Sequence, residues 1–266
     1  MTETLARFEE LKVGLNSVFV KQKLAAAQMD RGDLTSVKQV LAEVLAESRK
    51  TGKPAEEAQT LLTMCRLSIY EDDFTQAIKH LDASKAIDLR LSRELRVAYC
   101  DYMMAIISLQ QNDPETADAL LKNVTPKIVV LLPDDEAMLL FVRSRAQAMA
   151  GNLAEAQKTF EQANQSVADS VTEDLSIQLI RQFERALSLD ALGLREDAIH
   201  ELQSVVSNAD KQGWLSLKWE AAVVHAELRN ATNEKLPEPE LSGLHQLLIK
   251  NGFVAFAKRI DAISQQ

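Results

Sequence analysis

The sequence predicts an all-α protein built as an α-solenoid of about five to six helix–turn–helix repeats, with a capping helix at each end. Two observations carry this prediction. Glycine occurs only 8 times and proline 6 times in 266 residues, whereas the good helix formers Ala, Leu, Gln, Glu and Lys are frequent. In addition, a pattern of small and large apolar residues recurs about every forty residues, which is typical of repeat architectures.

The pattern is clearest in five segments, where a small or β-branched residue is followed four positions later by a large apolar one. Residues four apart lie on one face of a helix. Each segment is therefore predicted to open the second helix of a unit, with a small residue beside a large one on its inner face. The five pairs are Val37 and Leu41, Ala77 and Leu81, Ala117 and Leu121, Ala156 and Phe160, and Ala198 and Leu202.

A second set of small residues stands twelve positions before each of these small positions. Small side chains at such a place allow two antiparallel helices to approach closely, because the interaxial distance depends on the side chains at the contact. We therefore predict that they mark the crossing point of the first helix in each unit. The residues are Ala25, Cys65, Ala105, Ser144 and Ala186, and Ala226 continues the series.

Glycine and proline fall where helices of this register should end and begin. The glycines are Gly32, Gly151 and Gly193 within units and Gly52 and Gly213 between units, and the prolines are Pro54 and Pro114.

The predicted organisation is a leading helical cap at residues 1–16, a repeat domain at 17–250 and a closing helix at 251–266. The repeat units are predicted at about 17–52, 54–90, 92–132, 134–170, 172–212 and 214–250.

Two stretches fit the repeat less well. Lys127–Leu132 is apolar and β-branched, so it suits either a short strand or the tail of a second helix, and we favour the helix. The stretch at 233–240 contains two prolines among charged residues and is predicted to be a solvated loop. It interrupts the sixth unit, as expected for the end of a solenoid, where the core must be covered by a different face.

The segment at 151–163, GNLAEAQKTFEQA, resembles the second helix of the tetratricopeptide repeat, and the resemblance extends over roughly 17–230. It implies a right-handed solenoid. The family's large aromatic near the start of the first helix, its later tyrosine and its closing proline are missing, and the period is near 40. This degenerate form is similar to the repeats of bacterial regulators of the maltose-activator type and to those attached to some bacterial cyclases and kinases.

Charge and motif content narrow the classes of function. The formal net charge is −9, which argues against nonspecific nucleic-acid binding. No stretch approaches 18 apolar residues and the N-terminus lacks the features of a signal peptide, so no membrane contact and a cytoplasmic location are expected. The sequence contains no glycine-rich phosphate loop, no zinc-binding pattern and no nucleophile elbow. We therefore expect no enzymatic activity, no cofactor and no metal.

The resemblance implies that the first helices line a concave groove, near 59–70, 99–110, 138–149 and 180–191. Arginines there would suit the carboxylates of a partner, and aromatic side chains would supply anchoring area. Two alternatives remain open: the apolar candidates could be core between repeats, and the arginines could pair internally with Glu184 or Asp190. The candidate binding residues are Arg66, Tyr99, Tyr102, Met138, Phe141, Arg145 and Phe183.

The expected function is that of a non-enzymatic adaptor or scaffold, a bacterial regulatory protein that binds a segment of another protein in the groove, with an acidic segment as one option. The alternative is a sensor module that binds a signal peptide or small molecule and controls an effector supplied in trans. A homodimer through apolar terminal residues is also open, with Val18, Phe19 and Val20 near one end or Phe253, Val254 and Phe256 near the other.

Overall fold

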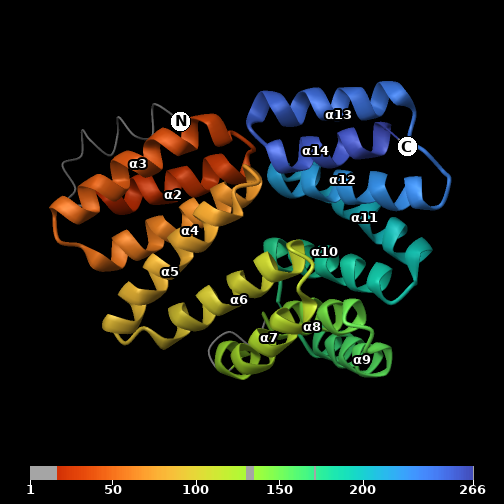
Figure 1. Cartoon of the computed structure of the whole chain (residues 1–266), viewed down its shortest axis with the longest axis horizontal. Helices are drawn as coiled ribbons and strands as arrows, with labels where there is room; N and C mark the ends of the chain where they lie inside the picture. The colour runs from red at the N-terminus through yellow and green to blue at the C-terminus, as the bar shows by residue number, and fades with distance from the viewer. Residues whose placement is uncertain (1–16, 130–134, 171, 266) are drawn as a thin grey trace.

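The computed structural model describes residues 17–129, 135–170 and 172–265, and these form thirteen α-helices and no strand (Figure 1). The predicted all-α solenoid is confirmed, whereas the leading cap at 1–16 lies outside the described residues. The helices are α2 (Ser17–Asp30), α3 (Leu34–Lys50), α4 (Pro54–Tyr70), α5 (Phe74–Arg90), α6 (Glu94–Gln110), α7 (Pro114–Val129), α8 (Glu136–Met149), α9 (Leu153–Asp169), α10 (Leu175–Ala191), α11 (Arg195–Lys211), α12 (Leu215–Ala231), α13 (Glu238–Asn251) and α14 (Val254–Ser264).

Most consecutive helices pack against each other along the chain, and α10 packs on α8 rather than on α9. The small residues of the repeat are buried at such helix contacts. Ser144 shows the geometry directly: its hydroxyl donates a 2.8 Å hydrogen bond to the backbone carbonyl of Ala156, twelve residues later on the facing helix. The predicted register is therefore correct. The first-helix positions Ala25, Cys65, Ala105, Ser144, Ala186 and Ala226 and the second-helix positions Val37, Ala77, Ala117, Ala156 and Ala198 are all buried.

The turns between helices repeat one backbone conformation. In the first turn, the amide of Asp33 donates to the carbonyl of Gln28 at 3.0 Å, which closes the helix end around a residue with positive φ. Glycine adopts this left-handed conformation freely, and Asp and Asn tolerate it better than other residues. The predicted junction glycines are confirmed. The positive-φ residues are Gly32, Gly52, Gly151, Gly193, Gly213 and Gly252, together with Asp72, Ser92, Asn112 and Asn233.

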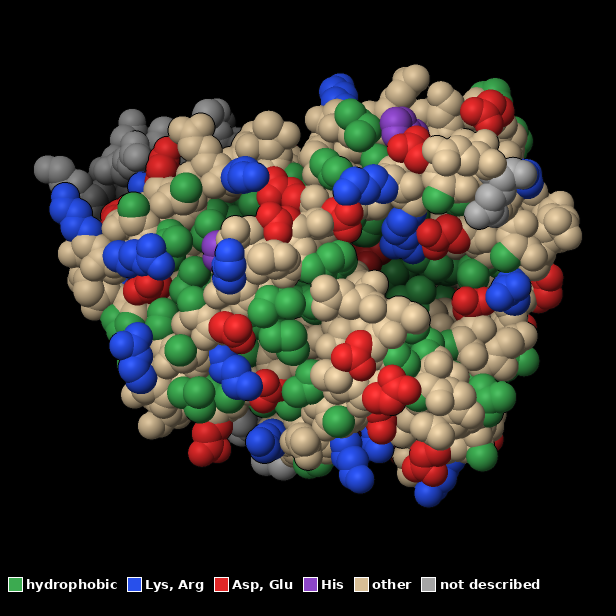
Figure 2. Space-filling model, in the orientation of Figure 1, with side chains coloured by type: hydrophobic (Ala, Val, Ile, Leu, Met, Phe, Trp, Pro, Cys, Tyr) green, Lys and Arg blue, Asp and Glu red, His purple; other side chains and the backbone are tan. Residues whose placement is uncertain are grey.

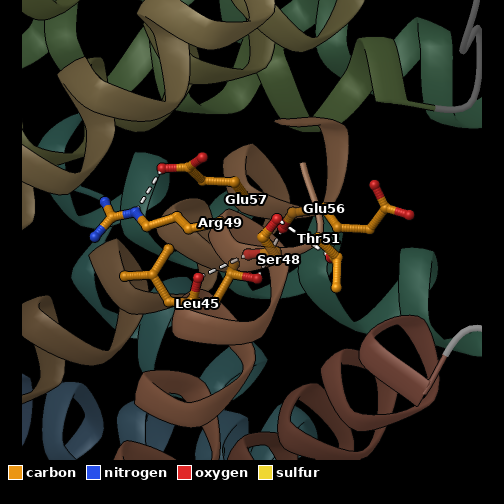
Figure 3. A network of polar contacts seen from close by, with 7 residues as sticks. Leu45, Ser48, Arg49, Thr51, Glu56 and Glu57 are labelled. Atoms are coloured by element: carbon orange, nitrogen blue, oxygen red, sulfur yellow. Dashed lines mark hydrogen bonds and ion pairs between the residues drawn. The ribbon is translucent and has the colours of Figure 1, made fainter. Parts of the chain in front are cut away.

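Side chains also fasten the junctions, as the turn between α3 and α4 illustrates (Figure 3). Arg49 of α3 and Glu57 of α4 point toward each other and form an ion pair of 2.7 Å. Next to them, the Thr51 hydroxyl donates to the carbonyl of Glu47 at 2.8 Å. Each of these exposed contacts adds little energy. Arg49 and Glu57 nevertheless connect the last helix of one unit with the first helix of the next.

Both stretches that fit the repeat less well, 127–132 and 233–240, are partly helical. Helix α7 continues through Pro126 to Val129, so the helical interpretation of that stretch is confirmed as far as the described residues extend. The predicted loop at 233–240 ends earlier than expected, because α13 begins at Glu238. Helix α12 then packs more extensively on α14 than on α13, and α13 covers α14.

The last helices return to the first ones, so the solenoid closes into a ring (Figure 1). Helix α12 contacts α2, and α14 contacts α4. The seam between them is aromatic. The ring of Phe253 is fully buried and lies 5.0 Å from Tyr70 of α4 and 5.2 Å from Trp219 of α12, measured between centroids. At its edge, the Lys258 ammonium lies 2.6 Å from the carboxylate of Asp72.

Two of the apolar terminal residues that the sequence suggested for pairing two copies, Phe253 and Phe256, lie in this seam. They are buried within the single chain, as is Val18, so these three offer no surface to a second molecule. Pairing of two copies through the terminal residues stays a prediction. Phe19 and Val254 stay exposed.

Gly32 links a helix turn to the seam. Its φ is +78°, and a Cβ atom placed on it would lie 2.4 Å from the indole ring of Trp219. Gly151 has a similar φ of +82° but has open space where a Cβ would lie. The two glycines therefore share a backbone constraint and differ only in the contact across the seam.

This pair gives a test of ring closure. Gly151→Ala should lower the free energy of unfolding by about 1 kcal/mol through backbone strain. Gly32→Ala should lower it by about 1–3 kcal/mol more, because Trp219 must move to accommodate the methyl group. Urea denaturation of both variants measures the difference. Equal losses would mean that Trp219 does not pack on this turn in solution and that the ring is open.

Candidate functional site

The first helices of the pairs face the middle of the ring and enclose a central cavity. The cavity has two adjoining chambers of ≈ 490 Å³ and ≈ 410 Å³. The larger is walled partly by the last helix and is called here the α14 chamber; it includes Phe256, Lys258 and Arg259. The smaller, called here the tyrosine chamber, includes Tyr70 and Tyr102. Both chambers are lined by Ile69, Gln110, Phe183 and Glu220.

The cavity is hollowed into the face of the molecule that Figure 2 presents. There the hollow lies between α14 and α10 of Figure 1, with hydrophobic side chains on its floor and acidic and basic side chains around its rim. The site is thus a largely apolar recess with a few charged groups, a composition common among ligand-binding cavities.

Six of the seven residues predicted from the sequence line this cavity, and one does not. Phe183 lines both chambers, and Arg145 lines the α14 chamber. The others are in the tyrosine chamber: Arg66, Tyr99, Tyr102 and Met138.

Phe141 is the exception, although it occupies the same repeat position as Tyr102 and Phe183. It is fully buried, and its ring centroid lies 5.4 Å from that of Phe160 on α9. The other four units carry leucine at the position of Phe160, so only here does a second aromatic ring pack against the first helix. This ring pair makes Phe141 part of the core between repeats, as the alternative interpretation held.

The two predicted arginines are paired with carboxylates of the chain itself. Arg66 lies 3.4 Å from Asp30, the last residue of α2. Arg145 lies 3.5 Å from Glu184 of α10, with side-chain exposures of only 13% and 10%. Asp190, the other acid considered for pairing, contacts Arg195 instead, at 2.9 Å. The arginines are therefore already engaged before any partner arrives.

The ion pair of Arg145 and Glu184 is buried and incompletely satisfied. Oε2 of Glu184 and Nε of Arg145 are both buried without a hydrogen bond. Burial raises the pKa of Glu184, and the positive charge of Arg145 opposes that rise. Such a pair gains little net stability, because removing both charges from water costs about as much as their attraction returns.

Glu220 of α12 is the functional candidate that sequence reasoning missed. Its carboxylate lines both chambers, and among the described residues no side chain or backbone group lies within hydrogen-bonding or ion-pairing distance of it. Burial raises its pKa to about 7. The positive charge of Arg259 opposes this rise, the negative charge of Glu184 adds to it, and Arg66 and Arg145 also oppose it. Glu220 is thus a carboxylate that feels nearby cations through space but forms no direct ion pair with any of them.

The repeat register could have found Glu220. It stands six residues before the small crossing residue Ala226, and the corresponding residues of three earlier units are Tyr99, Met138 and Ile180. All four line the tyrosine chamber. A carboxylate at a position that carries an uncharged residue in the other five units is the signal, and it is visible in the sequence once the crossing residues are aligned.

Helix α14 supplies cavity residues that the sequence gave no reason to choose. The guanidinium of Arg259 forms two hydrogen bonds with Glu227, of 2.7 and 2.6 Å, and Lys258 pairs with Asp72. These residues enter the cavity only because α14 closes the ring.

In the part of the chain that the structure describes, no cluster of His, Cys, Asp and Glu side chains is arranged to hold a metal ion. None of the described helices combines the length and the apolar character needed to cross a membrane.

Comparison with known proteins identifies the fold. No family model matches the sequence, and no curated protein matches it. Two solved structures of a putative kinesin light chain from Podospora anserina, described as having nearly identical TPR-like repeats, are similar with TM-scores of 0.53 and 0.52; the first is of a variant with a single substitution. Each is 20% identical over 74% of this chain and 96% of the other.

The chain therefore has a TPR-like repeat fold, as the resemblance of the sequence implied. Proteins of this fold generally mediate protein–protein interaction and are typically non-catalytic. At 20% identity the comparison shows the fold alone.

The raised pKa of Glu220 predicts a pH-dependent stability. Between pH of about 4.5 and 7 the folded state retains a proton that the unfolded state has released, so this group lowers the free energy of unfolding as pH rises. Glu220→Gln should therefore be more stable than the wild type at about pH 8, by up to about 3 kcal/mol. The difference should vanish below about pH 4, where both states are protonated.

Denaturation across this pH range measures the effect. The exposed Glu155 of α9 offers a matched control, since Glu155→Gln makes the same chemical change outside the cavity and should change stability little. A constant difference between Glu220→Gln and wild type at all pH values would show that Glu220 is not desolvated.

Proposed function

We propose that this protein is a non-enzymatic sensor module that binds a short peptide segment or a small molecule in its central cavity and controls an effector supplied in trans. The observation that carries the proposal is the closure of the ring by α12 and α14 against α2 and α4. An open concave groove would accept a long helix or strand laid along it. Once the ends meet, the groove becomes a recess whose wall includes helices from both ends of the described chain.

The size of that space suits a small ligand. The two chambers measure ≈ 490 Å³ and ≈ 410 Å³, within the range of about 300–1,000 Å³ that is usual for ligand pockets. A few amino-acid residues or a small organic molecule would fit as the cavity stands.

The wall of the cavity supports binding rather than catalysis. Aromatic side chains such as Tyr99, Tyr102 and Phe183 offer rigid contact area, while the charged groups are mostly held in internal ion pairs. Because the cavity wall includes both ends of the chain, a bound ligand would contact both sides of the seam. Binding would then stabilise the closed ring by mass action, which gives an effector a state to recognise.

Blocking the mouth of the α14 chamber tests the proposal. Ala262 is exposed and lines that chamber, so Ala262→Trp should fill its opening without disturbing the core. A thermal-shift screen of short peptides and small metabolites selects ligands, and titration calorimetry then measures their affinity. We expect binding to weaken by about tenfold or more in Ala262→Trp, since a blocked cavity loses a large part of the ligand contact.

Ala154 on α9 is also exposed but lies outside the chambers, so Ala154→Trp is the matched control and should bind like the wild type. Ligands that bind both tryptophan variants with unchanged affinity would show that the site is elsewhere.

A second candidate function is that of an adaptor that docks a partner protein on its outer surface. Leu247 and Ile249 of α13 are 47% and 53% exposed, and α13 covers α14 on the outside of the ring. Exposed apolar side chains become useful at an interaction surface when a partner covers them. This alternative keeps the general role of the fold and needs no ligand in the cavity.

Variants of α13 separate the two functions. If the adaptor function is correct, Leu247→Asp combined with Ile249→Asp should abolish capture of a specific partner in tagged pull-downs, because charged groups cannot be desolvated in an apolar interface. Ala262→Trp should leave that capture intact. Leu153→Asp, at another exposed leucine, is the control for a charge added to the surface. Capture that is lost in Ala262→Trp and kept in the α13 variant would instead support the sensor function.

A further inference from the structure

We propose that the ligand of the central cavity carries a positive charge, an ammonium or guanidinium group on a short peptide or on a small organic amine, and that Glu220 is its counter-ion. The inference rests on the proposed function, since it names the chemical class of ligand for the same cavity. It reverses the expectation, drawn from Arg66 and Arg145, that the partner is acidic.

The charged side chains that line the two chambers are mostly paired with one another. Four of them are cations, and each contacts a carboxylate of the chain. Three of these carboxylates also line the chambers, whereas Glu227, the partner of Arg259, does not. The pairs are Arg66 with Asp30 at 3.4 Å, Arg145 with Glu184 at 3.5 Å, Lys258 with Asp72 at 2.6 Å and Arg259 with Glu227 at 2.6 Å.

Once these pairs are set aside, one charged lining group is left among the described residues, the carboxylate of Glu220. Among the described residues, the cavity wall therefore carries one carboxylate that no cation contacts directly, and each cation of the wall already has a direct partner. A carboxylate or phosphate ligand would meet Glu220 and Glu184 with no free arginine to receive it. A cation would complete the only open pair.

Glu220 lines both chambers, at their junction, together with Ile69, Gln110 and Phe183. A group bound there is reached from either chamber. A charge-assisted hydrogen bond is roughly twice as strong as a neutral one, and a poorly solvated carboxylate that gains a cationic partner recovers interaction energy that it lacks in the empty cavity.

Aromatic side chains form much of the wall of the tyrosine chamber. The residues are Tyr70, Tyr99, Tyr102, Phe183 and Trp214. The faces of aromatic rings attract cations, and the attraction grows when water is excluded. Arg96 already lies over the ring of Tyr99, with 5.8 Å from the guanidinium carbon to the ring centroid, so this wall accepts such contacts. An unpaired carboxylate beside several rings is a combination that favours organic cations over metal ions.

The experiment compares probes that differ only in charge. The peptide arm uses acetylated, amidated tripeptides Ala-Arg-Ala, Ala-Gln-Ala and Ala-Glu-Ala. The amine arm uses 2-phenylethylamine, 2-phenylethanol and 3-phenylpropionate. Titration calorimetry with the full chain should show that the cationic member of at least one arm binds at least about tenfold more tightly than its neutral and anionic counterparts. The arm that responds identifies the source of the charge.

The variants assign the preference to one residue. Glu220→Gln should abolish the advantage of the cation, whereas Glu220→Asp, which keeps the charge, should retain part of it, and the exposed Glu155→Gln should retain all of it. Circular dichroism confirms that each variant is folded. A neutral or anionic probe that binds as tightly as the cation, or a preference that survives Glu220→Gln, would overturn the inference.

The outcomes also separate this inference from the proposed function. Neutral or anionic probes that bind the wild type and are excluded by Ala262→Trp would leave the cavity as the ligand site while overturning its charge preference. No binding of either cationic probe at millimolar concentration would overturn the inference as well. The proposed function would then depend on whether the screened ligands of the Ala262→Trp experiment bind.

Discussion

The aromatic contact between the two ends of the chain is the interaction on which the rest of the structure depends. Phe253 lies between Tyr70 of α4 and Trp219 of α12, with ring centroids 5.0 and 5.2 Å away. A stacked row of helix pairs buries its core only between neighbours and needs a cover at each end. Here the first and last units cover each other. The same contact turns a concave groove into a recess bounded by both ends of the chain, so fold and candidate site share one cause.

The closed ring also explains the unusual electrostatics of the cavity. Carboxylates on α10 and α12 line the cavity, and the pKa of Glu184 and that of Glu220 both rise through burial. Glu184 forms a direct ion pair with Arg145 at 3.5 Å, whereas Glu220 forms none with the described residues. A carboxylate kept at some cost in stability is characteristic of functional sites, and the repeats around the ring supply the rigidity that holds it there.

Comparison of sequence and structure shows which physical signals are local. Small residues such as Ala105 and Ser144 predicted the helix crossings because contacts between adjacent antiparallel helices depend on a fixed spacing along the chain. The same register brought six of seven predicted residues to the cavity. It misplaced Phe141 because Phe160, an unusually large residue at its position, draws that ring into the core. It missed Glu220 because a carboxylate does not fit the pattern of arginines and aromatic rings expected of a groove that binds an acidic segment, and only alignment of equivalent positions distinguishes it.

The sequence by itself therefore determined the helices, their turns, their pairing and the inward face of each unit, since all of these follow from periodicities shorter than one repeat. Only the tertiary structure decided that the solenoid closes, which charges are compensated and which one is left over. The reason is the range of the contacts. Lys258 and Asp72 are 186 residues apart, and whether they meet depends on the small rotation between successive units, summed around the ring, which no single repeat encodes.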